Sequence, residues 1–318
     1  MKLQILSTID LSYCKKELNK IKTFAKYNYH IGSVSSLKKK IKKTNIYISN
    51  AGYVVDSNLL SDADNLKEIY SPSTGTDHID INYLSKKGVK LYHIAKKIRV
   101  LNNFSATSEL VFGLIFLINR KLIDAYEAAK KGYWPREKYI GNQLKDKTFG
   151  ILGYGRLGAI SAKIARGFGM KVIAHDIKKK FNKSISFVSM NRLFSESDYL
   201  SVHIHLNKKT ENLITNKFLK LMKKNSILIN TSRGKIINEK DLLDVLKRKK
   251  IAGAALDVID GEWLNQTQLK NHKLIKHMNK NDNLVIVPHI GGTTVESIAG
   301  SRKYICDLLI KNLKKYKK

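Results

Sequence analysis

The chain has 318 residues, of which 43% are hydrophobic, so it is long enough for two ordinary globular domains, and extensive disorder is excluded. Cys14 and Cys306 are its only cysteines, which excludes a disulfide framework and a cysteine metal cluster. The longest apolar run, Leu110 to Ile118, is too short to cross a bilayer, and no secretory signal precedes the first predicted strand. We therefore expect a reduced, cytoplasmic protein with no bound metal.

The net charge of +33 is the unusual feature of the composition. A polyanion partner, such as a nucleic acid or an anionic membrane, would account for it. However, the lysines are spread over every segment from Lys15 to Lys318, and arginine is sparse. Nucleic-acid sites favour arginine in a local patch. We therefore expect a solvated, lysine-rich surface with no specific nucleic-acid partner and no membrane partner.

Strands and helices alternate through the first third of the chain. Strands are predicted at residues 1–9, 27–31, 45–48, 66–70 and 89–93, and helices at 14–25, 36–43 and 81–88. This alternation predicts a small doubly wound α/β domain. The loop from Ser71 to Gly75 follows a strand and contains Pro72, so it is suited to anion capture. The alternative is an ordinary turn without a ligand.

A polar linker is predicted at residues 96–103, followed by one long helix at 105–132. Further strands are predicted at 148–152, 170–174, 199–204, 226–229, 252–258 and 283–287, with helices at 159–165, 216–222, 239–248 and 293–315. The last helix is expected to pack back on the first domain. The predicted domains are therefore 1–100 with 293–318, which is discontinuous, and 101–292.

A glycine motif, Gly153-x-Gly155-x-x-Gly158, follows the strand at 148–152. Gly153 allows a tight turn, Gly155 lets a pyrophosphate lie against the backbone, and Gly158 lets the helix pack closely on the sheet. The helix N-terminus offers N–H groups and a positive dipole end to phosphates. The motif alone also fits a glycine turn without a ligand. The flanking strand, the helix and a following acid favour a dinucleotide site.

That acid is Asp176, at the end of the next strand. Its carboxylate would accept hydrogen bonds from the adenosine ribose and repel a 2′-phosphate, so NAD is expected as the cofactor. Lys178, Lys179 and Lys180 follow it and could instead meet a 2′-phosphate, which leaves NADP as the alternative. His203 ends another strand of the same predicted sheet, so it is expected near the cofactor.

Three strand ends of the second domain deliver Arg233, Glu262 and His289 to one edge of the sheet. Hydride transfer to a carbonyl needs a proton donor, and an imidazole suits this role. It also needs a cation for the substrate carboxylate, which the planar guanidinium matches. The carboxylate of Glu262 would favour the protonated imidazole, and Asp257 could hold a nicotinamide carboxamide. Each of these residues alone would more often be structural or solvated.

With these residues placed, the chain resembles the D-isomer-specific 2-hydroxyacid dehydrogenases, and especially their phosphoglycerate dehydrogenase branch. The resemblance covers essentially the whole chain. It is carried by residues 73–80, 106–110, 150–158, 230–234, 255–262 and 288–293.

The resemblance implies a Rossmann-type NAD domain inserted into a flavodoxin-like substrate domain, a homodimer, and interconversion of a small D-2-hydroxy acid with its 2-oxo acid. It implies Arg233 for substrate, Glu262 rather than Asp260 as the partner of His289, and His289 as acid–base. It also implies substrate contacts at Thr74 and Gly75, and cofactor contacts at Arg156, Leu157, Asp176, Thr231, Asp257 and Gly291.

The chain departs from the family where proline is frequent, at Ile177, His205 and Trp263. The first two bear on cofactor preference, and the third bears on the loop after Glu262. The sequence does not distinguish between 3-phosphoglycerate, hydroxypyruvate and glyoxylate as the substrate, although 3-phosphoglycerate is favoured. No C-terminal regulatory domain is expected, nor feedback by an amino acid through one. The alternative function is that of a dinucleotide-sensing, corepressor-like binding protein.

Overall fold

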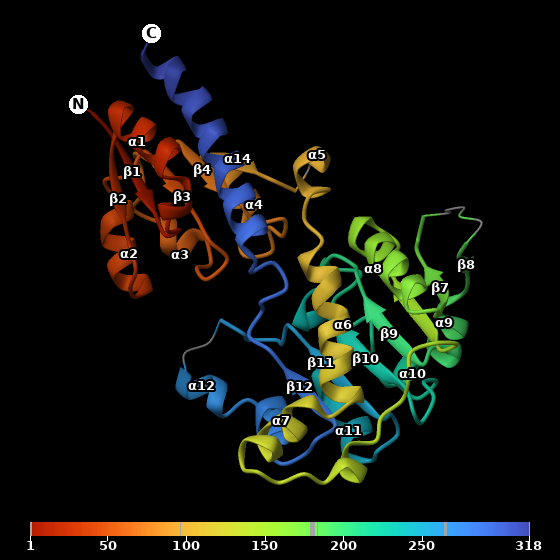
Figure 1. Ribbon diagram of the computed structural model, residues 1–318. Coiled ribbons are helices and arrows are strands. Elements are labelled where there is room, and N and C mark those ends of the chain that lie inside the picture. Colours follow the sequence, from red (N-terminus) through yellow and green to blue (C-terminus); the bar gives the residue numbers. More distant parts are fainter. Residues whose placement is uncertain (1, 96, 179–181, 183, 264–265, 318) are drawn as a thin grey trace. The chain divides into compact units, whose positions relative to one another are not determined.

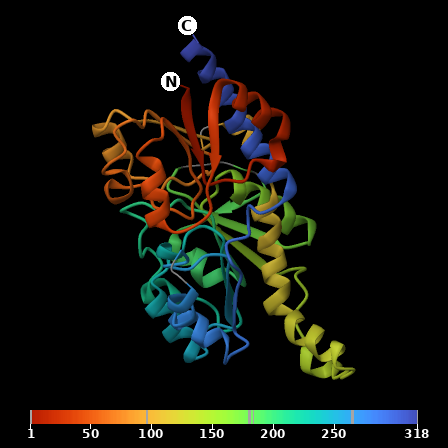
Figure 2. The same ribbon diagram turned by 90° about the vertical axis from the view of Figure 1, so that its left-hand side faces the viewer.

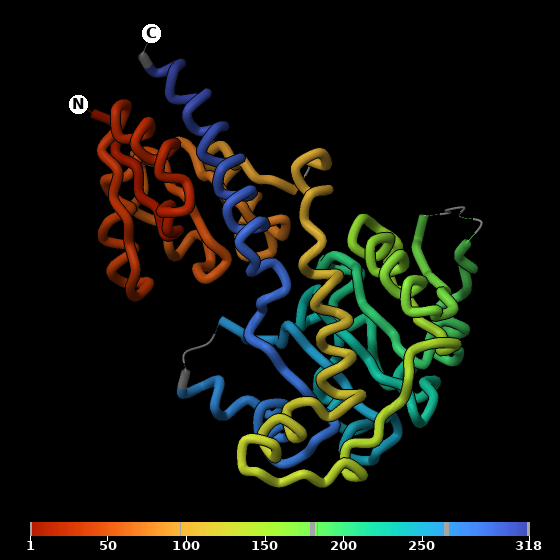
Figure 3. The backbone as a smooth tube through the Cα atoms, in the orientation of Figure 1, coloured from red at the N-terminus to blue at the C-terminus, as the bar shows by residue number. Residues whose placement is uncertain are grey.

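The computed structural model describes residues 2–95, 97–178, 182, 184–263 and 266–317. The chain divides into two compact units, which are Met1–Phe104 with Thr294–Lys318 (unit 1) and Ser105–Thr293 (unit 2). The chain therefore leaves unit 1 once and returns to it once, as the tube in Figure 3 traces. The boundaries predicted from the sequence fell after residues 100 and 292.

Unit 1 holds a five-stranded parallel sheet in the order β2-β1-β3-β4-β5, which is the flavodoxin-like order. Its strands are β1 Leu3–Ser7, β2 Ala25–Tyr29, β3 Ile46–Ile48, β4 Glu68–Ser71 and β5 Lys90–His93. Its helices are α1 Lys15–Phe24, α2 Val34–Ile41, α3 Ser57–Leu60, α4 Ile81–Lys86, α5 Ile98–Leu101 and α14 Val295–Leu313 (Figure 1).

The two faces of this sheet bury alternate residues of the same strands, as a two-residue period requires. On one face, Ile5, Ile46 and Ile48 pack with residues of α1 and α14. On the other face, Leu6 and Tyr47 pack with residues of α2, α3 and α4. Each fully buried side chain of this kind stabilises the fold by about 1.5–3 kcal/mol, so helices on both faces are needed to complete the core of unit 1.

Unit 2 holds a seven-stranded parallel sheet in the order β12-β11-β10-β9-β6-β7-β8. Its first strand, β6, lies between β9 and β7, which is the dinucleotide-binding order with a switch point between β6 and β9. The strands are β6 Thr148–Leu152, β7 Lys171–His175, β8 Ser186–Phe187, β9 Tyr199–Val202, β10 Ile227–Asn230, β11 Gly253–Leu256 and β12 Leu284–Ile286. Both sheet orders confirm the predicted fold class.

Helices cover both faces of the sheet of unit 2 (Figure 1). They are α6 Ala106–Asn119, α7 Leu122–Lys130, α8 Arg156–Gly167, α9 Met190–Glu196, α10 Asn216–Leu219, α11 Glu239–Lys247, α12 Gln266–Lys270 and α13 Lys273–Met278. Helices α6 and α8 pack on one face, against Phe149 and Ile151 among others. Helices α9, α10, α11 and α13 pack on the other, against Leu200 and Leu228 among others. Packing on both faces fixes the sheet, and with it the carboxyl ends of its strands.

The long helix predicted at residues 105–132 is wrong, because it is two helices. Helix α6 ends at Asn119, and Lys121 has a left-handed backbone with φ of 47°. The side chain of Asn119 donates a hydrogen bond to the carbonyl of Asn142 at 2.7 Å, so a tertiary contact is present where the helix ends. The predicted linker at 96–103 also differs from the structure, because it includes α5.

One stretch, Ile98–Asn119, is long and apolar enough to cross a membrane by length and composition. It comprises α5 and α6, separated by residues 102–105, and these two helices belong to different units. Val111, Leu114 and Ile115 of α6 are fully buried against the sheet of unit 2. The apolar character of α6 is therefore that of a core helix.

Candidate active site

The glycine turn joins β6 to α8 in the manner expected for a dinucleotide site. Gly153 has φ of +96°, a conformation that glycine adopts without strain. A Cβ atom on Gly158 would lie 2.3 Å from the carbonyl oxygen of Gly153, so the helix packs on the turn at the closest possible approach. A Cβ atom on Gly155 would meet nothing within 4 Å. The backbone at Gly155 therefore borders the open space that a pyrophosphate needs.

These two glycines give a matched pair for a test. Gly155→Ala adds a methyl group in open space, so we expect an unchanged melting temperature. The affinity for NADH should fall by about tenfold or more, because the methyl group would occupy the space of the pyrophosphate. Gly158→Ala forces the helix off the turn and should cost about 1–3 kcal/mol of folding stability. Thermal unfolding and NADH titration of both variants check this. Equal loss of stability in both would contradict it.

Asp176 lies at the end of β7 and is fixed by two backbone amides. Its Oδ2 accepts a hydrogen bond from the amide of Tyr154 at 2.9 Å, and its Oδ1 accepts one from the amide of Lys178 at 2.9 Å. The first contact places the carboxylate beside the glycine turn. Two other lysines weighed for a 2′-phosphate, Lys179 and Lys180, lie outside the described residues.

The segment after β10 is shaped by the side chain of Asn230. That side chain accepts a hydrogen bond from the amide of Ser232 at 3.0 Å and donates one to the carbonyl of Arg233 at 2.9 Å. Nη1 of Arg233 donates to the carbonyl of Ser232 at 2.7 Å. Thr231 is 7% exposed, and its buried Oγ1 has no hydrogen-bond partner among the described residues. A buried hydroxyl left unpaired costs about 1–3 kcal/mol, so Thr231 fits a contact to a bound cofactor.

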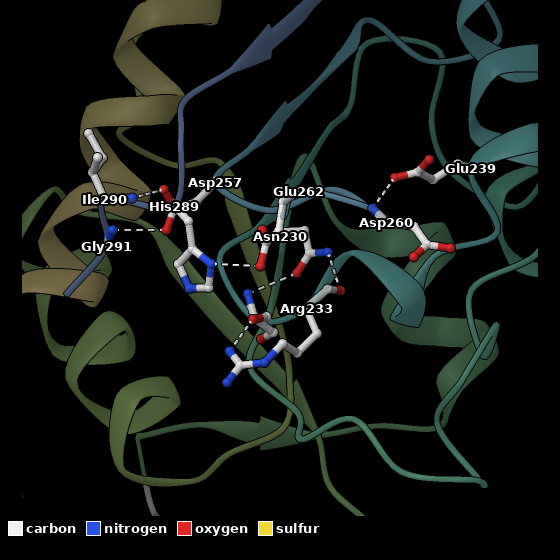
Figure 4. A network of polar contacts seen from close by, with 10 residues as sticks. Asn230, Arg233, Glu239, Asp257, Asp260, Glu262, His289, Ile290 and Gly291 are labelled. Carbon is white, nitrogen blue, oxygen red and sulfur yellow. Dashed lines mark hydrogen bonds and ion pairs between the residues drawn. The ribbon is translucent and has the colours of Figure 1, made fainter. Parts of the chain in front are cut away.

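His289 and Glu262 face each other, as Figure 4 shows, with Nδ1 of the ring 2.8 Å from Oε1 of the carboxylate. Both side chains are mostly buried, at 27% and 15% exposed. Because a carboxylate only accepts hydrogen bonds, the Nδ1 atom carries hydrogen, which leaves Nε2 to exchange a proton with a substrate. The indole of Trp263 lies against the imidazole, with ring centroids 5.8 Å apart.

Asp257 holds the backbone on which His289 is presented. His289 has φ of +53°, a left-handed conformation that costs a non-glycine residue about 1–3 kcal/mol. The carboxylate of Asp257 accepts hydrogen bonds from the amides of Ile290 at 2.6 Å and Gly291 at 2.9 Å. Burial raises the pKa of Asp257, and these two amides oppose the shift. The nicotinamide contact predicted for Asp257 would use the remaining lone pairs of the same oxygens.

The other predicted cofactor residues of unit 2 lie on the elements expected for them. Arg156 begins α8, and burial lowers the pKa of its guanidinium. The carbonyl of Leu157 accepts a hydrogen bond from Ser108 Oγ at 3.0 Å, which ties α8 to α6. His203 follows β9 with its Nε2 atom 2.9 Å from Ser201 Oγ. Burial lowers the pKa of His203 to about 4, so its ring is neutral at pH 7.

Thr74 and Gly75 belong to unit 1, on the loop that follows β4. This loop is tied to the strand end by a hydrogen bond from the amide of Ser73 to Ser71 Oγ at 3.3 Å. The structure thus brings Arg233, Glu262 and His289 to neighbouring strand ends of unit 2 (Figure 4), while the two proposed substrate residues lie in the other unit.

Sequence reasoning missed two residues that shape the site. The sequence analysis predicts no role for Asn230, although an asparagine between a buried strand and a turn often caps backbone groups with its side chain. Glu239 accepts a hydrogen bond from the amide of Asp260, 21 residues away in sequence. No local pattern reports such a contact.

Two family models match this chain. The model described as D-isomer specific 2-hydroxyacid dehydrogenase, NAD binding domain, matches residues 112–291, and the corresponding catalytic-domain model matches residues 5–101. The chain belongs to the D-isomer specific 2-hydroxyacid dehydrogenases. The family assignment confirms the predicted resemblance, NAD as cofactor, and NAD-dependent dehydrogenase activity on a D-2-hydroxy acid.

Individual relatives agree with this family assignment. The chain is 35% identical over 288 residues to the glyoxylate reductase of Thermococcus litoralis, covering 87% of this chain and 82% of that protein. It is 31% identical over 283 residues to the D-3-phosphoglycerate dehydrogenase of Methanocaldococcus jannaschii, covering 87% of this chain but 51% of that protein. The crystal structure of D-lactate dehydrogenase from Aquifex aeolicus with NAD and lactic acid is similar at a TM-score of 0.85 and 26% identity, covering 98% of this chain and 96% of that one.

Proposed function

We propose that this dehydrogenase interconverts a small, unphosphorylated 2-oxo acid of the glyoxylate or hydroxypyruvate type with its 2-hydroxy acid, using His289 as acid–base. The observation that carries the proposal is the 2.8 Å contact between His289 Nδ1 and Glu262 Oε1, on strand ends next to the one that presents Arg233. The identity of the reacting acid and the histidine chemistry are the parts that need a test.

Bound NADH would supply a hydride to the carbonyl carbon of the substrate. In that direction, Nε2 of His289 donates a proton to the oxygen as it becomes an alcohol, and in the reverse direction it accepts that proton. Glu262 stabilises the imidazolium through its contact with Nδ1, and it also fixes the plane of the ring. The mostly buried setting of the pair strengthens this interaction, because fewer water molecules screen it.

Arg233 is proposed to bind the substrate carboxylate through its planar fork of N–H donors. The hydrogen bonds of the Asn230 side chain fix the backbone of the turn at Ser232 and Arg233, and this fixes the position of the Arg233 Cα atom. Thr74 and Gly75, on the loop after β4, are proposed as further substrate-binding residues. A carboxylate fixed by Arg233 would align the neighbouring carbonyl for hydride transfer and restrict the reaction to 2-oxo acids.

Three features of unit 2 fit NAD as the group that would be held there. Gly155 borders open space, Thr231 has a buried hydroxyl without a partner among the described residues, and Asp176 is fixed beside the glycine turn. A fixed carboxylate repels a 2′-phosphate, so we propose a preference for NADH over NADPH. A lower Michaelis constant for NADPH than for NADH would overturn this preference.

Arg99 and Arg136 are two arginines that could bind a substrate phosphate, and their exposure supports an unphosphorylated substrate. The side chain of Arg136 is 81% exposed and lies 3.6 Å from the carboxylate of Glu137. Arg99, on α5, is also exposed. A phosphate held by such solvated side chains gains little affinity, because water and salt screen the attraction. Lys96, which precedes α5 in the chain, lies outside the described residues.

The direct test is NADH oxidation, followed by absorbance, with glyoxylate, hydroxypyruvate, pyruvate, 2-oxoglutarate and 3-phosphohydroxypyruvate as substrates. We expect the highest kcat/KM with glyoxylate or hydroxypyruvate. A preference for 3-phosphohydroxypyruvate would replace the proposed substrate with the phosphorylated one. Tight NADH binding with no turnover of any acid would favour the dinucleotide-sensing alternative.

We also propose that the protein is a homodimer that pairs through α7 and the segment after it. Large apolar side chains there are exposed: Ile123 at 50%, Tyr126 at 63%, Trp134 at 75% and Ile140 at 76%. In Figure 2 this segment, yellow to yellow-green, extends away from the sheet of unit 2. Large apolar side chains left exposed along one segment favour an interaction surface there. Light scattering should give a dimer mass that falls to a monomer in Trp134→Ser/Ile140→Ser, and a monomeric wild-type protein would refute the proposal.

A further inference from the structure

A second carboxylate, Glu239, lies beside the segment that carries Glu262 (Figure 4). Glu239 is the first residue of α11, and its Oε1 accepts a hydrogen bond from the backbone amide of Asp260 at 2.7 Å. Its Oε2 lies 3.1 Å from Nε2 of His272, the residue that precedes α13. The side chains of Glu239 and His272 are only 20% and 14% exposed. Both oxygens of this carboxylate therefore have partners from separate parts of unit 2.

The peptide between Ile259 and Asp260 is fixed by a second contact. A Cβ atom on Gly234 would lie 2.0 Å from the carbonyl carbon of Ile259 and 2.3 Å from the amide nitrogen of Asp260, so backbone packs directly on backbone there. Gly261 then turns the chain with φ of +80°, and Glu262 follows. The position of the Asp260 amide thus determines the position of the backbone that carries the Glu262 side chain.

The stretch that presents Arg233 also supports the turn that presents Glu262. Gly234 and Glu239 follow Arg233 in sequence, and both contact the Ile259–Asp260 peptide. We infer that Glu239 is a positioning residue for the His289–Glu262 pair and acts by anchoring the Asp260 amide. This inference rests on the proposed function of that pair. A carboxylate suits the task because hydrogen bonds to an ionised acceptor are shorter and stronger than those to a neutral one.

The anchor depends on the charge of Glu239, so it responds to pH. Burial raises the pKa of Glu239 to about 7, while the Asp260 amide lowers it and the Asp260 carboxylate adds to the increase. Among the described residues, the titratable groups that face Glu239 are that carboxylate, on the turn, and the imidazole of His272, which precedes α13. Because the pKa is raised, Glu239 is ionised above about pH 7 and becomes neutral as the pH falls through it. The hydrogen bond to Asp260 then weakens.

The acidic side of the pH profile should therefore report on Glu239. In the direction of 2-oxo acid reduction, kcat should fall on this side as Glu239 loses its charge. A substitution at Glu239 is expected to remove this acidic limb.

The test compares Glu239→Ala, Glu239→Gln and the matched control Asp244→Asn. Asp244 lies on the same helix and pairs with Arg248 at 2.7 Å on the surface. Glu239→Ala removes the acceptor, so kcat should fall about tenfold, because small misplacements of catalytic groups are costly. The KM for the 2-oxo acid and the Kd for NADH should stay within about twofold of wild type. Glu239→Gln keeps an acceptor without the charge, so it should retain more activity and lose the acidic limb. Asp244→Asn should match wild type.

Hydrogen exchange of the peptide covering residues 258–263 gives a readout that needs no turnover. The amide of Asp260 should exchange faster in Glu239→Ala than in wild type, and at the wild-type rate in Asp244→Asn. Unchanged exchange in Glu239→Ala would overturn the anchor, whatever the activity. Faster exchange with an unchanged kcat and pH profile would overturn its positioning role. A wild-type protein that reduces no 2-oxo acid would instead refute the proposed function, while the exchange result would still decide the anchor.

Discussion

His289→Gln is expected to lower kcat for 2-oxo acid reduction by about a thousandfold, while the Kd for NADH stays within about twofold of wild type. Glutamine is close to histidine in size and can still donate a hydrogen bond to Glu262, but it cannot transfer a proton at neutral pH. The loss should therefore fall on the chemical step, with little change in the folded state. Stopped-flow NADH oxidation and a separate NADH binding titration measure the two effects.

Two further variants separate proton transfer from general damage. Glu262→Gln removes the charge that stabilises the imidazolium, so we expect a smaller loss of about tenfold to a hundredfold. His277→Gln removes a buried imidazole that bonds Asn283 at 2.9 Å in another part of unit 2, and kcat should be retained. If His289→Gln kept more than a tenth of the wild-type kcat, another group would have to be the proton donor.

Arg233→Ala is expected to lower kcat/KM for the 2-oxo acid by about a thousandfold or more, through both a higher KM and a lower kcat. One hydrogen bond to a charged group contributes about 1.5–3 kcal/mol, and a bidentate guanidinium–carboxylate contact contains two. The rate falls as well, because a carboxylate that is no longer fixed leaves the carbonyl misaligned. Initial-rate kinetics over a wide range of substrate concentration distinguish the two contributions.

Arg233→Lys tests the shape of the cation separately from its charge. It should recover only part of the activity, since an ammonium is a point charge without the planar fork. Arg248→Ala is the matched control, because that guanidinium is 68% exposed and pairs with the nearby Asp244 of α11, so no kinetic change is expected. A loss of NADH affinity equal to the loss of substrate affinity in Arg233→Ala would move Arg233 from the substrate to the cofactor.

The parts of the fold that could be predicted were those written in local patterns. The strand at 148–152, the glycine turn and the acid at 176 each follow from residue types at fixed spacing, and the structure has β6 at Thr148–Leu152 with Asp176 bonded to the turn. The active-site residues were accessible for a related reason. Polar residues in the loops that follow buried parallel strands gather at one edge of the sheet, and Arg233, Glu262 and His289 do so.

The features that escaped prediction depend on contacts between distant residues. Residues 105–132 keep a helical pattern throughout, and Lys121 carries no glycine or proline signal for the break, which coincides with the contact between Asn119 and Asn142. The left-handed backbone of His289 is likewise supported from a distance in the sequence. The carboxylate of Asp257 accepts a hydrogen bond from the amide of the next residue, Ile290, which is 33 residues later in the chain. A hydrogen bond from a backbone amide to a buried carboxylate produces no repeating pattern in the sequence. Such contacts can therefore be recognised only in the three-dimensional structure.

The route of the chain also constrains the order in which the protein can be completed during synthesis. On one face of the sheet of unit 1, α1 covers part of the buried cluster and α14 covers the rest, through Ile305, Leu309 and Leu313. These residues leave the ribosome after all of unit 2 has emerged. The nascent chain must therefore keep Ile5 and Ile46, which that helix helps to cover, from aggregating while the inserted unit is made. The strands that are translated first are therefore the last to have their sheet face fully covered.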